Sequence, residues 1–237
     1  MKNKFLLTAA LAMGVLVAQA QTFSPGFHGF SKKKTTYITM KDGKELEGTL
    51  KGLSFKKGLI DDIKFINAET GKKEKINPEK IDHMYVPPSN LAKLSAKMDA
   101  ATDLTKIRDN ELSSEHLEDG YLYMESSQVL IKKKVRNCML QIVNPTFSGK
   151  IKVYNDPYAK ESVGVGVGGM TLAGGLDKSY YIKKEGEDVA KKITKKDYKK
   201  EMAELFSDCP DLVAKYNADP KWSEFEKFIY EYSTTCK

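Results

Sequence analysis

Strand-type patterns fill most of the chain from residue 37 onward, whereas helical patterns are concentrated at its C-terminal end. Residues 45–50 alternate between polar and apolar side chains, and they follow Asp42-Gly43, a dipeptide typical of two-residue hairpin turns. Residues 63–66 and 81–86 repeat the strand pattern. A chain whose strands and helices are separated in this way favours the α+β class, with helices packed on an antiparallel sheet.

The first 20 residues have the pattern of a secretory signal peptide. Two lysines give a positive start, residues 5–17 are apolar or small, and Ala18-Gln19-Ala20 is a small-x-small cleavage site. We expect the mature chain to begin at Gln21, and residues 21–36 to form a flexible arm. No later apolar run reaches the roughly 20 residues of a membrane-spanning helix, so we expect no transmembrane helix.

Residues 37–86 are expected to form one small unit. Its predicted order is a long hairpin, a second hairpin, a single helical turn at 77–80 and a closing strand. The segments M-K-D-G-K-E-L-E-G-T-L and I-N-P-E-K-I-D-H-M-Y-V carry this order. The unit resembles small SH3-like and Sm-like barrels, and the resemblance implies a barrel-like domain that serves as an interaction module.

Pro87-Pro88 marks the end of this unit, because the residue before a proline is pushed out of the helical region. We expect residues 87–119 to be a helical or irregular connector. Residues 120–237 are expected to form a second unit, an antiparallel sheet packed with C-terminal helices. Residues 138–143 have apolar side chains on both faces, which predicts the central strand of that sheet.

The helices of the second unit begin after Thr194-Lys195-Lys196-Asp197, which resembles a capping box. Apolar residues then recur at helical spacing from Tyr198 to Phe206, and again from Trp222 to Tyr232. We expect these aromatic faces to pack on the sheet as its core.

The sequence assigns no catalytic, cofactor-binding or metal-binding residue. The glycines at 164, 166 and 169 fit G-x-G-x-x-G, but a strand rather than a helix is predicted to follow, so the motif predicts no dinucleotide site. The three histidines have no partner at metal-ligand spacing. Carboxylate pairs suited to acid–base chemistry are inevitable in a chain with 32 acidic residues, so they indicate no particular reaction.

Three cysteines follow the predicted signal peptide, which indicates an oxidising compartment and one bridge with one spare thiol. Cys209 precedes one predicted helix and Cys236 follows the next, and an antiparallel helix pair brings such positions towards each other. We predict a Cys209–Cys236 disulfide, with a free buried pair as the alternative. Cys138 is then a small buried thiol on a strand.

A run of lysines is the sharpest functional signal in a basic chain of net charge +7. If residues 191–200 were helical, two neighbouring rows of like charge would form a possible anion-binding face, although a solvated helix face is the more ordinary interpretation. The six lysines of this predicted face are Lys191, Lys192, Lys195, Lys196, Lys199 and Lys200.

The C-terminal sequence contains E-L-F-S-D-C-P-D-L at 204–212, F-I-Y-E-Y at 228–232 and Cys236. It resembles a pattern, F-x-D-C-P-x-L followed by Y-x-x-x-C, of an uncharacterised family of small secreted Bacteroidota proteins. The resemblance implies the periplasm or cell surface of a Gram-negative bacterium, and it implies no activity.

The leading functional hypothesis is therefore a non-catalytic secreted envelope protein that binds a macromolecule or an anionic envelope component. Its partner would be an envelope protein, a glycan or an anionic lipid, and nucleic acid is excluded by the expected secretion. The alternative is a hydrolase acting on envelope or dietary polymer. No cofactor is predicted for either function.

Overall fold

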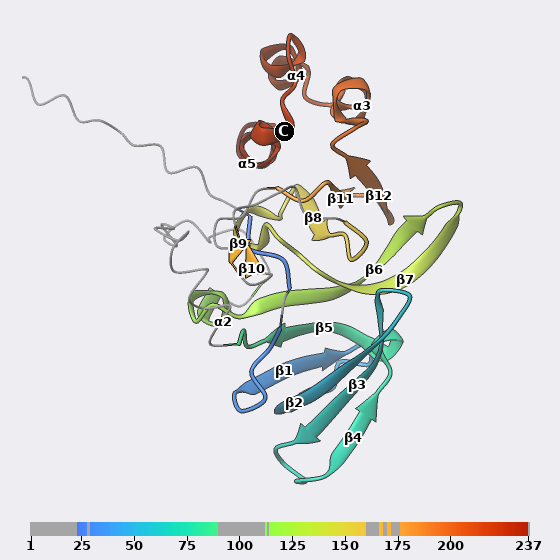
Figure 1. The fold of residues 1–237 in the computed structure, drawn as a ribbon, viewed down its shortest axis with the longest axis vertical. Helices are drawn as coiled ribbons and strands as arrows, with labels where there is room; N and C mark the ends of the chain where they lie inside the picture. The colour runs from blue at the N-terminus through green and yellow to red at the C-terminus, as the bar shows by residue number, and fades with distance from the viewer. Residues whose placement is uncertain are drawn as a thin grey trace, which may run out of the picture.

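The computed structural model describes residues 23–27, 29–89, 112, 114–159, 166–167, 170–171 and 176–236. These residues form an α+β fold with one large, mostly antiparallel open sheet and several C-terminal helices (Figure 1). The predicted fold class is confirmed at this level. The predicted signal peptide and most of the predicted connector lie outside the described residues.

The N-terminal half contains five strands and one short 3-10 helix. They are β1 (Thr35–Met40), β2 (Glu45–Lys56), β3 (Leu59–Asn67), β4 (Lys73–Ile76), η1 (Pro78–Lys80) and β5 (Ile81–Val86).

The C-terminal half begins with the short helix α2 (Ser114–Glu118) and continues mostly as strands. These strands and the turn among them are β6 (Leu122–Ile131), β7 (Lys134–Gln141), η3 (Pro145–Phe147), β8 (Ile151–Asn155), β11 (Ser179–Lys184) and β12 (Val189–Thr194). Two short strands, β9 (Gly166–Val167) and β10 (Met170–Thr171), form a separate hairpin. The chain then ends in α3 (Tyr198–Leu205), α4 (Pro210–Asn217), η4 (Trp222–Glu224) and α5 (Phe225–Thr235).

The strand order of the large sheet is β4-β3-β2-β1-β5-β6-β12-β11-β8, and β7 pairs with β6 outside this path. The strand that joins the two halves is β6. It pairs antiparallel with β5 through residues 122–125, and parallel with β12 at residues 128–129. Its other edge pairs with β7 over residues 124–131. The N-terminal strands and the C-terminal layers therefore meet at one shared strand (Figure 1).

The predicted hairpins, the helical turn and the closing strand of residues 37–86 are all present, but a closed barrel is not. The closing strand β5 continues the sheet by pairing with β6, and β4 lies at the far edge of the strand order. Alternate side chains of these strands, such as Ile38, Leu50 and Phe65, form a buried cluster on one face. The strands cross closely at Gly48, where a Cβ atom would lie 2.0 Å from the carbonyl oxygen of Ile66.

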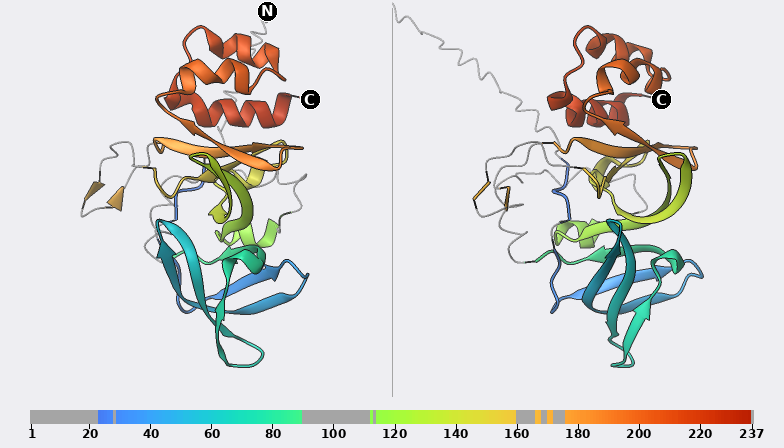
Figure 2. Two further views of the ribbon diagram at one scale, coloured as in Figure 1. Left: turned by 90° about the vertical axis from the view of Figure 1, so that its right-hand side faces the viewer. Right: turned by 45° about the vertical axis from the view of Figure 1, so that its right-hand side comes forward.

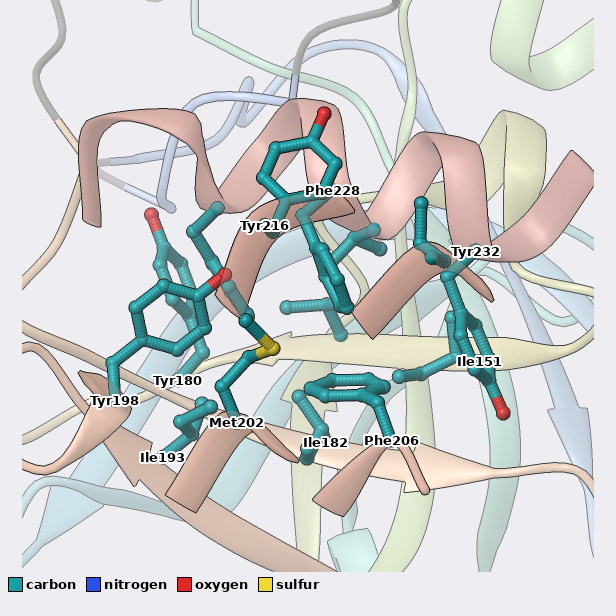
Figure 3. Close-up of a cluster of buried hydrophobic side chains, with 14 of the residues drawn as sticks. Ile151, Tyr180, Ile182, Ile193, Tyr198, Met202, Phe206, Tyr216, Phe228 and Tyr232 are labelled. Carbon is teal, nitrogen blue, oxygen red and sulfur yellow. The ribbon is translucent and has the colours of Figure 1, made fainter. Parts of the chain in front are cut away.

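The C-terminal helices cover one face of the strands β8, β11 and β12, as Figure 2 shows. Figure 3 shows isoleucines and a tyrosine of these strands pointing at aromatic side chains of the helices. The predicted aromatic face of residues 222–232 is confirmed, because Trp222, Phe225, Ile229 and Tyr232 are all buried in this cluster.

Residues 23–27 and 29–30 run along both clusters, although the sequence predicted a flexible arm there. The ring of Phe23 packs against Tyr180 and Phe225 of the C-terminal cluster, with ring centroids 5.3 and 6.0 Å away. Phe27 and Phe30 pack against the N-terminal cluster. Burial of three aromatic rings holds this segment on the folded protein.

The prediction of residues 138–143 as the central strand is wrong in its pairing. β7 pairs with β6 and lies off the main strand path, and the central position belongs to β6. Both faces of the second half of β7 are nevertheless buried. The reason is that β7 lies between the N-terminal cluster, which contains Met139, and a third cluster, which contains Cys138 and Leu140.

Candidate functional site

A groove lined by lysines lies on β2, β3 and β4, at the edge of the sheet. It has a volume of about 520 Å³. In the β3–β4 pair, Lys64 is directly opposite Lys75, and Ile66 is directly opposite Lys73. Lys51 of β2 also lines the groove, together with Phe65, Ile66 and Glu74.

The two-residue period of a strand explains why these lysines share one side. Along β3, Ile63, Phe65 and Asn67 are buried, whereas Lys64 is exposed between them. β4 repeats the pattern, with Lys73 and Lys75 exposed. The face opposite the N-terminal core is therefore a basic surface with Ile66 as an apolar floor.

The groove carries more positive charge than its neighbours neutralise. Among the described residues, its four lysines make one ion pair, between Lys75 Nζ and Asp62 Oδ2 at 3.5 Å. Lys51 Nζ donates a hydrogen bond to the carbonyl oxygen of Lys32 at 2.8 Å. Like charges directly opposite each other destabilise a pair of strands, so the placement of Lys64 against Lys75 favours an anion between them.

The lysines of the predicted anion-binding face do not lie on one helix. Lys191 and Lys192 belong to the strand β12, so their side chains point to opposite faces. The β-branched Val189 and Ile193 suit a strand, and β12 pairs with both β6 and β11. Only Lys199 and Lys200 of the six belong to α3, because the helix begins at Tyr198. The prediction of a helix over residues 191–200 is wrong.

Acidic side chains also neutralise half of these six lysines. Lys191 Nζ is 2.9 Å from Glu187 Oε1, Lys192 Nζ is 2.6 Å from Asp156 Oδ2, and Lys199 Nζ is 3.5 Å from Asp219 Oδ1. Lys195, Lys196 and Lys200 are exposed. The structure therefore does not bring the six together as one continuous basic face.

A buried glutamate forms the second cluster of charged groups, between β6 and the strands β8 and β11. Glu125 is 7% exposed. The hydroxyl of Tyr154 donates to its carboxylate, and Lys152 Nζ is 2.8 Å from its Oε2 atom. Lys183 Nζ is 3.9 Å from Oε1 and donates to Ser127 Oγ at 3.1 Å. Both carboxylate oxygens are engaged, so this cluster joins the layers and leaves no carboxylate oxygen free for a substrate.

Burial shifts the pKa values of two groups around Glu125. It lowers the pKa of Lys183, because desolvation disfavours the charged ammonium, although the nearby Glu125 opposes this effect. It raises the pKa of Tyr154 well above its ordinary range, and the carboxylate of Glu125 raises that pKa further.

Asp156 forms a third cluster immediately after β8. Its side chain is fully buried, and its Oδ2 atom accepts from Ser179 Oγ at 2.6 Å besides its ion pair with Lys192. Its Oδ1 atom accepts from the backbone N–H of Tyr158 at 2.9 Å. These three partners fix the carboxylate of Asp156 within the turn after β8, so its role is structural.

The predicted cysteine pairing is present in the structure. Cys209 and Cys236 form a disulfide with a Cα–Cα distance of 5.6 Å. Cys138 is free and buried, and burial raises the pKa of its thiol to about 11. A buried thiol with a raised pKa is a poor nucleophile at neutral pH.

The described residues contain neither a cluster of metal ligands nor a helix that could span a membrane. Within the ranges that the structure describes, no three His, Cys, Asp or Glu side chains are grouped as metal ligands. None of the described helices is long and apolar enough to cross a membrane.

No family model, no curated protein and no solved structure matches this chain.

The groove lysines were not among the residues that the sequence singled out. Lys64, Lys73 and Lys75 each lie in or beside a segment predicted as a strand, and alternation there indicates their exposure. What the sequence does not contain is the register that puts Lys64 opposite Lys75. Lysines at outward positions of two consecutive strands, Lys64 on one and Lys73 and Lys75 on the next, are the signal that could have found them.

Proposed function

We propose that this protein is a non-catalytic secreted protein of the cell envelope that binds an anionic polymer, foremost an acidic glycan, through the lysine groove. One observation carries the proposal: four lysines line the groove, two of them directly opposite each other, and among the described residues one acid, Asp62, forms an ion pair with them.

The geometry of the strands supports a polymer over a small anion. Neighbouring strands lie about 4.8 Å apart, and outward residues of one strand are separated by about 6.6 Å. Lys64, Lys73 and Lys75 therefore present a small lattice of charges rather than a single point. A chain with a carboxylate or phosphate on successive units would contact several lysines at once, and its affinity would fall with salt.

Two features support the envelope as the location. The first 20 residues have the signal-peptide pattern, and the Cys209–Cys236 disulfide suits an oxidising compartment. The resemblance to small secreted Bacteroidota proteins adds the periplasm or cell surface of a Gram-negative bacterium. The interaction role expected for residues 37–86 belongs to the same proposal, because the groove lies within this part of the sheet.

The test measures binding of the chain from Gln21, which contains every described residue, to fluorescently labelled polygalacturonate at low and high salt. The triple variant Lys64→Gln, Lys73→Gln and Lys75→Gln removes the groove charges. We expect wild-type binding at low salt and a loss of about 10-fold or more in the variant, because each exposed ionic contact contributes a few tenths of a kcal/mol to 1 kcal/mol. Neutral dextran measures binding that does not depend on charge.

The matched control is the variant Lys191→Gln, Lys195→Gln and Lys199→Gln, which removes the same charge from the predicted anion-binding face. If this control loses binding and the groove variant keeps it, the groove is not the site. Absence of wild-type binding to polygalacturonate and to polyphosphate at low salt would contradict the proposal. Shortening of the polymer during incubation would instead identify the alternative function, a hydrolase.

A further inference from the structure

Large apolar side chains are exposed at four positions among the described residues, and three of them lie near two hairpin tips. Phe55 is 56% exposed at the end of β2, and Leu130 and Val135, which face each other across the β6–β7 hairpin, are 39% and 52% exposed. The fourth is Tyr158, which is 42% exposed just after β8. Exposed apolar side chains that gather in one place mark an interaction surface.

Basic residues are interleaved with these apolar side chains. Lys56 and Lys57 follow Phe55 directly, and Arg136 follows Val135. Residues 132–134 are three consecutive lysines between Leu130 and Val135. None of these six basic side chains makes an ion pair with another residue that the structure describes. The nearest acid along the chain is Asp61, on the far side of the β2–β3 turn.

The backbone of both tips holds a lysine in an unusual conformation. Lys57 has φ of 50° and Lys132 has φ of 59°, and they are the only described non-glycine residues with positive φ. A side chain in this left-handed region is uncommon, and such residues cluster at functional surfaces. Glycine or asparagine is the more usual residue in such turns, and both tips carry a lysine there instead.

The two tips lie next to each other on the folded protein. A Cβ atom built on Gly58, in the β2–β3 turn, would lie 2.9 Å from the ring of Tyr158. Burial and the nearby Cys138 raise the pKa of that same Tyr158, and the charge of Arg136, from the β6–β7 hairpin, opposes them. Both hairpins turn on the right-hand side of Figure 1. They form one surface, which we call the tip surface and which comprises residues 55–58, 130–136 and Tyr158.

We propose that the tip surface docks the protein on the surface of a lipid bilayer that contains anionic lipids. Lysines contact the headgroups, while the apolar side chains between them enter the interface. An acidic glycan would use the charges but leave Phe55 and Val135 in water. Because the tip surface carries both charged and apolar side chains, it favours lipid. This surface is separate from the lysine groove on β3 and β4, and the inference does not depend on the proposed glycan binding.

The experiment is co-sedimentation of the chain from Gln21 with vesicles of phosphatidylcholine alone, or with phosphatidylglycerol added. We expect binding only to the phosphatidylglycerol vesicles, weakened by salt. Each lysine near an anionic surface contributes about fivefold to partitioning. The tip variant Lys132→Gln, Lys133→Gln and Lys134→Gln is therefore expected to bind roughly 100-fold more weakly. The matched control is the variant Lys191→Gln, Lys195→Gln and Lys199→Gln, which removes the same charge outside both the tip surface and the groove and is expected to bind nearly as well as wild type.

A second variant tests the apolar contact separately from charge. Phe55→Trp places an exposed indole at the tip, whereas Trp222, the native tryptophan, is buried. We expect the fluorescence emission of this variant to shift to shorter wavelength when phosphatidylglycerol vesicles are added. Three results would overturn the proposal: no binding to those vesicles at low salt, equal losses in the tip variant and the control variant, or no emission shift in a bound Phe55→Trp protein.

Discussion

Glu125 connects three strands through side chains rather than through backbone pairing. Tyr154 and Lys152 reach it from β8, and Lys183 reaches it from β11. A charge inside a protein is costly when it has no partner, and much less so when it is paired and hydrogen-bonded. The three donors around Glu125 therefore depend on it, and its removal leaves a poorly solvated lysine beside a tyrosine hydroxyl that has lost its acceptor.

We expect Glu125→Ala to lower the free energy of unfolding by about 3–5 kcal/mol, the usual effect of breaking a buried ion pair from one side. Urea unfolding monitored by circular dichroism measures it. Glu69→Ala, at an exposed glutamate, is the control and should change stability by less than about 0.5 kcal/mol. The double variant Glu125→Gln with Lys183→Met should have a free energy of unfolding between those of Glu125→Ala and wild type. Equal stabilities of Glu125→Ala and wild type would contradict the role given to this residue.

At the scale of secondary structure, the boundary between β12 and α3 shows what the sequence can and cannot predict. Thr194 and Asp197 interact as the sequence pattern suggests: Thr194 Oγ1 donates to Asp197 Oδ2 at 2.7 Å, and the Asp197 N–H donates to Thr194 Oγ1 at 3.1 Å. The N-cap of α3 is nevertheless Asp197, whose side chain makes no capping hydrogen bond, so the pattern lies one turn before the helix start. The preceding Lys191 and Lys192 also fit helical spacing, but their pairing with Ile182 and Tyr181 of β11 places them in a strand. The spacing of the lysines contains no information on that pairing.

The disulfide was predictable because it depends on two helices that are neighbours in the sequence. It links the start of α4 to the end of α5 across a separation of 27 residues. We expect the variant Cys209→Ser with Cys236→Ser to unfold with a free energy lower by about 3–4 kcal/mol, from the chain entropy of a loop of that length. Urea unfolding of wild type with and without reductant provides the comparison. A reductant that also destabilised the double variant would show that the effect lies elsewhere.

At the scale of the whole molecule, the sequence predicted the α+β class and the aromatic helix faces, but an enclosed N-terminal barrel is replaced by an open sheet. The closing strand β5 was predicted correctly, and its second neighbour β6 lies beyond the connector. The lysine groove was missed for the same reason as the open sheet: both follow from which strands pair, and in which register. Composition and alternation indicate which side chains are exposed, and pairing decides which of them meet.

Buried ionisable groups in all layers predict a loss of stability in alkaline solution. The pKa of Cys138 rises from an ordinary 9.0 to about 11, and burial raises the pKa values of Tyr154, Tyr180, Tyr181 and Tyr198 above 10.0. The unfolded chain loses these protons first, so the stabilisation is complete below pH 9 and is lost as the pH rises. Lys183 acts in the opposite direction, because its pKa is lowered.

We therefore expect the free energy of unfolding to fall steadily between pH 9 and pH 11, with about 2 kcal/mol of the loss from Cys138 alone. Urea unfolding at a series of pH values measures the slope. The variant Cys138→Ala should have a smaller slope between pH 9 and pH 10 and should keep the tyrosine contribution above pH 10. A stability that is constant over this range would contradict the burial of these groups.

Because β6 pairs first with β5 and then with β12, the N-terminal half can assemble as soon as it is synthesised, but the sheet is complete only when β12 arrives. That parallel contact joins segments far apart in the chain, and such contacts form slowly. Until then, the backbone of β6 beyond residue 125 is an open edge, ready to pair with a strand of another molecule. A newly made chain is thus most prone to aggregate before β12 pairs with β6, and a chaperone would be of most use during that interval.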